Sequence, residues 1–293
     1  MLNKLLTFIV VIEIILLVII NPVIKKTIKY KYSINTYKVS DIDKAKLENY
    51  IIGVVAAEMP ATFSIEALKA QAVAARTFAY KKIINNKLNF DNLYTDKGQA
   101  YITNEQMKNK WESKYEEYYQ KISEAVISTR DEIITYRDEP INAYYFSISN
   151  GKTEDSSSVF GEQSYLISVD SSWDINNASY SKSVTIPLSE FKERLNLNED
   201  IIINNVQRSN TNHVNNLMIN NKNYTGIEFR KLFNLRSTDF DINIDNNLVT
   251  INTKGHGHGV GMSQYGANSM ALEGKTYEEI IKYYYKDVKI SKI

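Results

Sequence analysis

Glu58 stands in a sequence context that can keep a carboxylic acid protonated near neutral pH. The apolar residues before it recur at helical spacing: Leu47, Ile51, Val54 and Val55. This helix, predicted over residues 45–58, should end there because Pro60 disfavours the α conformation at Met59. Partial burial and the negative end of the helix dipole both raise a carboxyl pKa, as a general acid requires. The alternative is a structural carboxylate paired with an arginine.

A second helix is predicted from an N-cap at Ser64 to about residue 83. Its alanines favour helix and permit close approach of a neighbouring element. Gln71, Arg76 and Tyr80 are polar insertions in this segment. Arg76 either pairs with Glu58 or holds an anionic group of a substrate, and the spacing does not decide between the two.

Residues 255–261 form a glycine-histidine loop, with glycine at every second position. Such a backbone can turn sharply and approach another group closely. The spacing is not that of a dinucleotide-binding loop. His256 and His258 lie two residues apart, with His213 the remaining histidine, and this pattern favours a pair lining a cleft over a zinc site. A helix capped by Ser263 and ended at Gly274 should follow, and a capping box at residues 276–279 opens another.

The rest of the chain alternates short strands and helices, which predicts an α+β fold with a cleft-bearing body. The strands are expected at residues 132–136, 141–147, 201–206, 217–219 and 248–252, the helices at 188–195 and 227–233, and a turn at 149–152.

The N-terminal residues predict one transmembrane helix. Residues 5–24 are apolar except for Thr7, Glu13 and Asn21, and twenty helical residues span roughly the 30 Å hydrocarbon core. No small-residue cleavage site follows, so we expect an uncleaved single-pass anchor. The expected organisation is an anchor over residues 1–24, an extended linker over 25–40 and a catalytic body over 41–293.

Composition limits the partners. The chain has 293 residues and a formal net charge of +1, but residues 1–38 hold six lysines and one acid, which leaves a mildly acidic body. An acidic body argues against nucleic-acid binding. The absence of cysteine excludes disulfides, thiolate zinc sites and a cysteine nucleophile. The lysines that follow the anchor favour a body in the cytoplasm, although long domains translocate regardless of that bias.

Four sequence blocks resemble the SpoIID/LytB family. Residues 48–80 read ENYIIGVVAAEMPATFSIEALKAQAVAARTFAY, and residues 253–285 read TKGHGHGVGMSQYGANSMALEGKTYEEIIKYYY. SNGKTEDSSSVFG at residues 149–161 and FRKLFNLRSTDF at residues 229–240 are similar to the intermediate blocks of the family. The blocks occur in family order, and the resemblance extends from about residue 40 to the C-terminus.

The resemblance implies a peptidoglycan lytic transglycosylase that acts during sporulation engulfment. It would lie outside the cytoplasmic membrane, in the space facing the forespore, and cleave bonds between N-acetylmuramic acid and N-acetylglucosamine to 1,6-anhydro ends. Glu58, in A-A-E-M-P, takes the place of the catalytic glutamate. The implied partners are glycan strands, the sporulation amidase and the membrane protein of the stage II machine. Some members have a cysteine-containing zinc site, where this chain carries Phe146 and Ser149. We therefore expect neither metal nor cofactor.

Polar and aromatic residues of these blocks are the expected substrate-binding groups: Gln71, Arg76, Tyr80, Ser149, Lys152, Glu154, His256, His258, Gln264 and Tyr265. Glu66 and Glu154 are available as a second acid, so hydrolysis stays open; otherwise Glu66 is a first-turn charge and Glu154 a solvated loop residue. Two rival functions also stay open. One is a non-catalytic glycan-binding module that stimulates an amidase, and the other is a structural membrane protein facing the cytoplasm.

Overall fold

The computed structural model describes residues 42–85, 91–94 and 99–293. Residues 50–293 form one compact unit. Within the described ranges, no helix has the length and apolar character needed to cross a membrane. The predicted anchor at residues 1–24 and linker at 25–40 lie outside those ranges. The expected α+β character is confirmed, because helices alternate with several small sheets.

The helices of the first half are α3 (Ile42–Glu58), α4 (Ile65–Ile84), α5 (Asn104–Trp111) and α6 (Tyr115–Ser128). Short 3₁₀ turns lie at Asp91–Tyr94, Glu112–Lys114, Ser156–Ser158 and Ser172–Asn176. The helices of the second half are α7 (Leu188–Leu195), α8 (Gly226–Leu232), α9 (Gln264–Leu272) and α10 (Tyr277–Tyr284). α3 ends at Glu58, as the proline predicted, and α10 opens with the predicted capping box between Thr276 and Glu279.

Four small sheets accompany these helices. One is antiparallel, with β1 (Glu132–Tyr136) between β11 (Lys289–Lys292) and β2 (Glu139–Pro140). A second is a two-residue parallel pair of β3 (Tyr145–Phe146) and β10 (Met262–Ser263). The other two are antiparallel, in the orders β4-β9-β8 and β5-β6-β7. Their strands are β4 (Ser181–Pro187), β8 (Phe240–Asp245), β9 (Leu248–Lys254), β5 (Ile203–Arg208), β6 (Val214–Ile219) and β7 (Lys222–Thr225).

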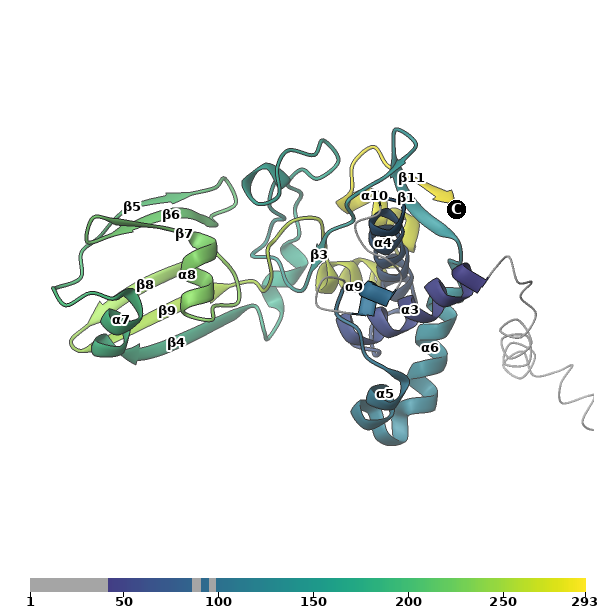
Figure 1. The fold of residues 1–293 in the computed structure, drawn as a ribbon, viewed down its shortest axis with the longest axis horizontal. Coiled ribbons are helices and arrows are strands. Elements are labelled where there is room, and N and C mark those ends of the chain that lie inside the picture. The colour runs from purple at the N-terminus through teal and green to yellow at the C-terminus, as the bar shows by residue number, and fades with distance from the viewer. Residues whose placement is uncertain (1–41, 86–90, 95–98) are drawn as a thin grey trace, which may run out of the picture. The chain divides into compact units, whose positions relative to one another are not determined.

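α4 is the central element of the helical part. It contacts α6, α9, α10 and β1, so segments that are far apart in the sequence pack side by side (Figure 1). Many of its buried side chains are alanines, whose small size allows close packing of the neighbouring elements. Arg76 is wholly buried in α4 and donates to the carbonyl oxygens of Val126 and Glu132 at 3.0 and 3.1 Å. It therefore ties α4 to the end of α6 and the start of β1.

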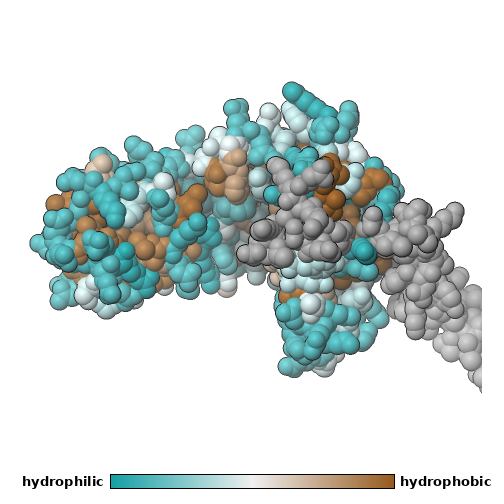
Figure 2. All heavy atoms as spheres, viewed as in Figure 1, coloured by the Kyte–Doolittle hydropathy of each residue, from teal (hydrophilic) through white to brown (hydrophobic). Residues whose placement is uncertain are grey.

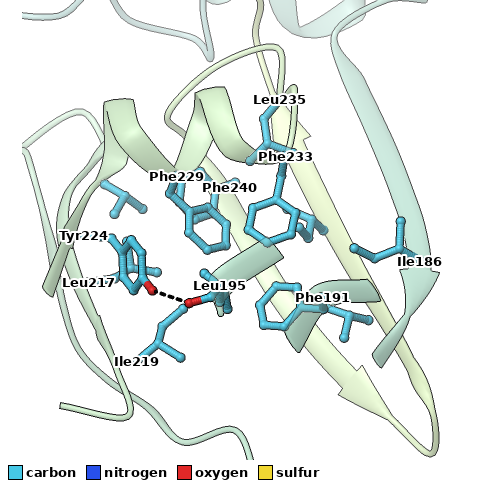
Figure 3. Close-up of a cluster of buried hydrophobic side chains, with 13 residues drawn as sticks. Ile186, Phe191, Leu195, Leu217, Ile219, Tyr224, Phe229, Phe233, Leu235 and Phe240 are labelled. Carbon is cyan, nitrogen blue, oxygen red and sulfur yellow. Dashed lines mark hydrogen bonds between the residues drawn. The ribbon is translucent and has the colours of Figure 1, made fainter. Parts of the chain in front are cut away.

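The two-sheet region, residues 181–254, has its own aromatic core (Figure 3). Phe229 stacks on Phe240 with ring centroids 4.9 Å apart, and Phe191 stacks on Phe233 at the same separation. α7 supplies Phe191 and α8 supplies Phe229, while Phe233 directly follows α8 and Phe240 lies in β8. On the face shown in Figure 2, hydrophobic residues of the surface appear in several groups between hydrophilic ones.

Several expected elements differ in extent. The predicted strand over residues 141–147 is reduced to β3, because the chain turns where Tyr144 N–H donates to Asn142 O at 2.9 Å. The helix at 188–195 is found as predicted, and the strand at 248–252 extends to Lys254. α5, α6, β4, β7 and β8 were not predicted, since β4 and β8 carry many polar residues that obscure strand periodicity.

Gly261 → Ala should destabilise the protein strongly. Gly261 has φ +84°, and an added Cβ would lie 2.0 Å from Tyr144 O, beside the β3–β10 pair. Gly274 → Ala is the matched control, because Gly274 has φ +90° with nothing within 4 Å of the added atom. The control should lose about 1–2 kcal/mol from backbone strain alone. Chemical denaturation should show a clearly larger loss for Gly261 → Ala, and equal losses would contradict the packing described here.

Candidate active site

Three distant segments of the chain meet at the carboxyl of Glu58. Glu58 is the last residue of α3 and is half-buried. Gln264, the first residue of α9, places Nε2 3.4 Å from Glu58 Oε2 and 3.4 Å from Oε1 of Gln71 on α4. Gln71 and Gln264 are both buried. Of the residues expected from the sequence, these three are brought together, with Tyr265 next in the chain.

Burial raises the pKa of the Glu58 carboxyl above its ordinary value. Hydrogen bonds with Gln264, with the backbone of Ala100 and with the Tyr145 hydroxyl oppose that rise in pKa but do not cancel it. None of the groups that shift this pKa is a cation. The expected arginine partner is directed elsewhere, since Arg76 donates to the two carbonyl oxygens named above. The site therefore disfavours the ionised carboxyl more than water does.

Tyr145, Gln99 and Tyr50 form a polar wall that the sequence did not reveal. Tyr145 on β3 donates to Gln99 Oε1 at 2.6 Å, and Gln99 Nε2 donates to Ala75 O at 3.2 Å. The backbone N–H of Gln99 donates to the Tyr50 hydroxyl at 3.4 Å. Proximity to Glu58 contributes to raising the pKa of both tyrosines, after desolvation. A predicted strand containing Tyr145 was the available signal, but periodicity could not direct it toward Glu58.

Asp174 fixes the start of α9, and the sequence analysis missed it. Its carboxyl is buried, and Oδ2 accepts from the Ser263 hydroxyl at 2.6 Å and from Ser149 N–H at 2.8 Å. Ser263 Oγ in turn accepts from Gly266 N–H as the N-cap of α9. The Ser149 hydroxyl donates to Ser171 O at 2.9 Å. Ser149, an expected substrate-binding residue, thus lies in a buried network that positions Gln264.

The glycine-histidine loop pairs with the segment after β3. His256 and Ile148 exchange backbone hydrogen bonds of 2.7 and 3.0 Å, and Glu154 N–H donates to Gly259 O at 2.7 Å. His258 lies against an aromatic group that includes Phe160, with ring centroids 5.0 Å apart. Burial lowers the pKa of His258 to about 4, so this imidazole is neutral near pH 7. His256 is exposed, and partial burial lowers its pKa too.

Glu154 is buried rather than solvated. Its Oε2 accepts from the hydroxyls of Thr211 and Ser209, the latter at 2.7 Å, and lies 3.9 Å from Nε2 of His213. Ser209, Thr211 and His213 all lie in the turn that connects β5 to β6. Glu154 therefore joins the glycine-histidine loop to the two-sheet region.

The remaining expected residues occupy three different settings. Tyr265 packs edge-on against Phe63, with ring centroids 4.9 Å apart, beside Gln264. Tyr80 is half-buried near the end of α4. Lys152 is exposed and lines a cavity that is described below.

The residues present do not fit the zinc site of some SpoIID/LytB proteins. The chain has no cysteine, and the described residues hold no group of three potential His, Asp or Glu ligands. Phe146 is apolar, while the amide and hydroxyl of Ser149 are bonded to Asp174 and Ser171.

Comparison with known proteins decides the family. A sequence profile described as SpoIID, stage II sporulation protein, matches residues 35–136. Stage II sporulation protein D of Bacillus subtilis (strain 168) is 40% identical over 274 residues, 88% of this chain and 79% of the relative. The chain belongs to the SpoIID family. The Bacillus amyloliquefaciens protein of the same name is also 40% identical, over 272 residues, 88% of this chain and 78% of the relative.

A more distant relative carries a different name. The amidase enhancer of Bacillus subtilis (strain 168) is 26% identical over 294 residues, 80% of this chain and 39% of the relative. Together these SpoIID relatives place the chain in a sporulation context and confirm the resemblance seen in its motifs.

Glu58 → Gln should stabilise the protein near neutral pH. Because the folded-state pKa of Glu58 is raised, its contribution to stability is full below the unfolded-state value near 4.5 and is lost as pH rises through the folded-state pKa. Glutamine carries no such charge penalty. Unfolding free energies measured by denaturant from acidic to neutral pH should therefore show an advantage for Glu58 → Gln that vanishes in acid.

Glu66 → Gln is the matched control for this measurement. Glu66 bonds Lys69 at 2.6 Å and accepts from Tyr277 N–H at 2.8 Å, so this variant should lose on the order of 0.5–1 kcal/mol. If Glu58 → Gln also lost stability at neutral pH, Glu58 would be a structural ion-pair residue.

Proposed function

We propose that this SpoIID protein is a membrane-anchored lytic transglycosylase that cleaves peptidoglycan glycan strands with Glu58 as its single acid–base group. The observation that carries the proposal is the half-buried Glu58 carboxyl, which has a raised pKa and no cation among the groups that shift it. A carboxylic acid that is still protonated near neutral pH can protonate a leaving oxygen.

The proposed reaction uses the Glu58 carboxyl twice, first as an acid and then, ionised, as a base. Glu58 gives its proton to the glycosidic oxygen between N-acetylmuramic acid and N-acetylglucosamine, and the C1–O bond breaks to leave an oxocarbenium-like muramoyl sugar. The Glu58 carboxylate then accepts the proton of the muramoyl C6 hydroxyl, whose oxygen attacks C1. The product is a 1,6-anhydro end and a free N-acetylglucosamine hydroxyl, no water is consumed, and Glu58 is protonated again.

The groups that bond Glu58 are uncharged, which suits a carboxyl that is protonated at one step and ionised at the next. Amide N–H groups such as that of Gln264, 3.4 Å from Oε2, can bind both the acid and the carboxylate. A lysine or arginine at that place would hold the carboxylate ionised and lower its pKa. The buried Asp174–Ser263 contact keeps Gln264 at the start of α9.

The carboxylates of Glu66 and Glu154 are already bonded to other groups of the protein, which favours this reaction over hydrolysis. A hydrolase normally needs a second carboxylate on the opposite face of the sugar. Glu66 is held by Lys69 and by the Tyr277 amide, and Glu154 is buried beneath Ser209 and Thr211. Neither carboxylate is free to activate water beside Glu58.

The proposed location and partners follow from the sequence and the family. The apolar residues 5–24 would anchor the protein, and the body would face the intermembrane space around the forespore. The sporulation names of the relatives support a role in engulfment beside the sporulation amidase and the membrane protein of the stage II machine.

The second candidate is a non-catalytic enhancer of a cell-wall amidase. The observation that favours it is the relative named amidase enhancer. In that case Glu58 serves structure or glycan binding, and no strand is cut by the protein alone.

Glu58 → Gln should abolish strand cleavage while keeping the fold. Glutamine has nearly the same shape but cannot deliver a proton, and general acid–base catalysis contributes about 10²–10⁴ in rate. The measurement is mass spectrometry of purified glycan strands after incubation, with anhydromuramoyl ends as the product. The control, Glu66 → Gln, should cleave within about threefold of the parent protein.

The alternatives give other products in the same assay. Reducing muramoyl ends would indicate a hydrolase, and strand binding without any cleavage by the parent protein would indicate the enhancer. Cleavage by Glu58 → Gln at a rate close to that of the parent would remove Glu58 from the mechanism.

A further inference from the structure

A cavity of about 370 Å³ lies where the segment after β3 meets the two-sheet region. Its walls come from residues 150–152 and 210–212, together with Asp170, Ser172, Ile175, Tyr180, Asp239 and Lys254. Its volume is that of a small-molecule site. Glu58, Gln71 and Gln264 are not among its lining residues, so it is separate from the candidate active site.

One wall of this cavity is built from groups that are already bonded. Asn150 Nδ2 donates to Asp239 Oδ2 at 2.7 Å and to Thr211 O at 2.6 Å, and the Tyr180 hydroxyl donates to Asn150 O at 3.1 Å. The Asp239 side chain is buried, and Arg208 lies 3.8 Å from its other oxygen. Asp239 is thus committed to the protein, and its negative charge is largely balanced.

The groups left for a ligand are mainly cationic and apolar. Lys152 and Lys254 are exposed, and neither ammonium makes a hydrogen bond or an ion pair with the part of the chain that the structure describes. Asp170 carries the remaining charge, and its Oδ2 accepts from the Ser172 hydroxyl at 2.8 Å. The half-buried ring of Tyr180 and the side chain of Ile175, 47% exposed, offer apolar contact.

We propose that this cavity binds a muramoyl unit of the glycan strand through its carboxylate. Lysine ammoniums recognise carboxylates by charge-assisted hydrogen bonds, and apolar side chains such as Ile175 and Tyr180 suit the C–H face of a sugar ring. Of the two sugars in the strand, the muramoyl sugar carries a carboxylic acid on its lactyl group. Where a stem peptide caps that group, the peptide's own carboxylates supply the same chemistry. This inference rests on the proposed peptidoglycan substrate.

The cavity is connected to the active site through its own wall. Ser172 and Ile175 line it and belong to the 3₁₀ turn Ser172–Asn176. The same turn contains Asp174, whose carboxyl accepts from Ser263 immediately before Gln264. Gly151, also in the wall, has φ +114°, and an added Cβ would lie 3.2 Å from Ile175. A strand bound in the cavity would therefore contact the turn that carries Asp174, the residue that positions Gln264 beside Glu58 through Ser263.

The test is a titration of the full protein followed by NMR chemical shifts. The probes are N-acetylmuramic acid, N-acetylglucosamine and a free stem peptide. We expect N-acetylmuramic acid to bind at least about tenfold more tightly than N-acetylglucosamine, and to lose about that factor in Lys152 → Ala/Lys254 → Ala. Lys231 → Ala/Lys275 → Ala, which removes two lysines that do not line the cavity, is the charge-matched control and should bind like the parent.

Each outcome of this titration decides the inference. If N-acetylmuramic acid binds and only the cavity variant loses that binding, the inference is supported and the recognised carboxylate is that of the free lactyl group. If the stem peptide binds and only the cavity variant loses that binding, the inference is supported and the recognised carboxylate belongs to the peptide. Equal binding of both sugars, or equal loss in both double variants, overturns it. If the protein forms anhydromuramoyl products but does not bind in this way, only the inference about the cavity is wrong. If it binds in this way but does not cleave the strand, only the proposed transglycosylase activity is wrong.

Discussion

The candidate site depends on one physical constraint: the Glu58 carboxyl is withdrawn from water, and no cation is among the groups that shift its pKa. Glu58 ends α3, where Pro60 stops the helix, and the groups that bond it there are uncharged. Taking a carboxylate out of water costs free energy, so the protonated form is favoured. The result is a raised pKa for Glu58, which is the property that the proposed role as an acid catalyst requires.

The other elements serve to bring Gln264 to this carboxyl. The alanine-rich α4 allows α9 to pack closely on it, although the two helices are nearly 200 residues apart, as the 193-residue separation of Gln71 and Gln264 shows. Asp174 accepts a hydrogen bond from Ser263, the N-cap of α9, and so fixes the start of that helix. The positive-φ glycines of residues 255–261 allow the chain to turn into β10, which pairs with β3. The glycine-histidine loop is therefore best understood as a backbone connection rather than a metal site.

Sequence reasoning reached the local features and missed the long-range ones. Pro60 and the capping box at Thr276 have local physical causes, so the ends of α3 and α10 were predictable. The partners of Arg76 were not predictable, because residue spacing does not show whether an arginine will bond a carboxylate or a backbone carbonyl such as that of Val126 near the end of α6. Asp174 gave no signal, since its neighbours Ser149 and Ser263 are distant in the chain and meet only after folding.

The most direct measurement is the ionisation of Glu58 itself. Carbon-13 NMR of side-chain carboxyls in glutamate-labelled protein follows each titration, and the signal missing from Glu58 → Gln identifies this one. We predict a midpoint clearly above the ordinary value of 4.5 for a glutamate. A midpoint at or below 4.5 would mean that Glu58 is held as a carboxylate, and it would contradict the assignment of Glu58 as the acid.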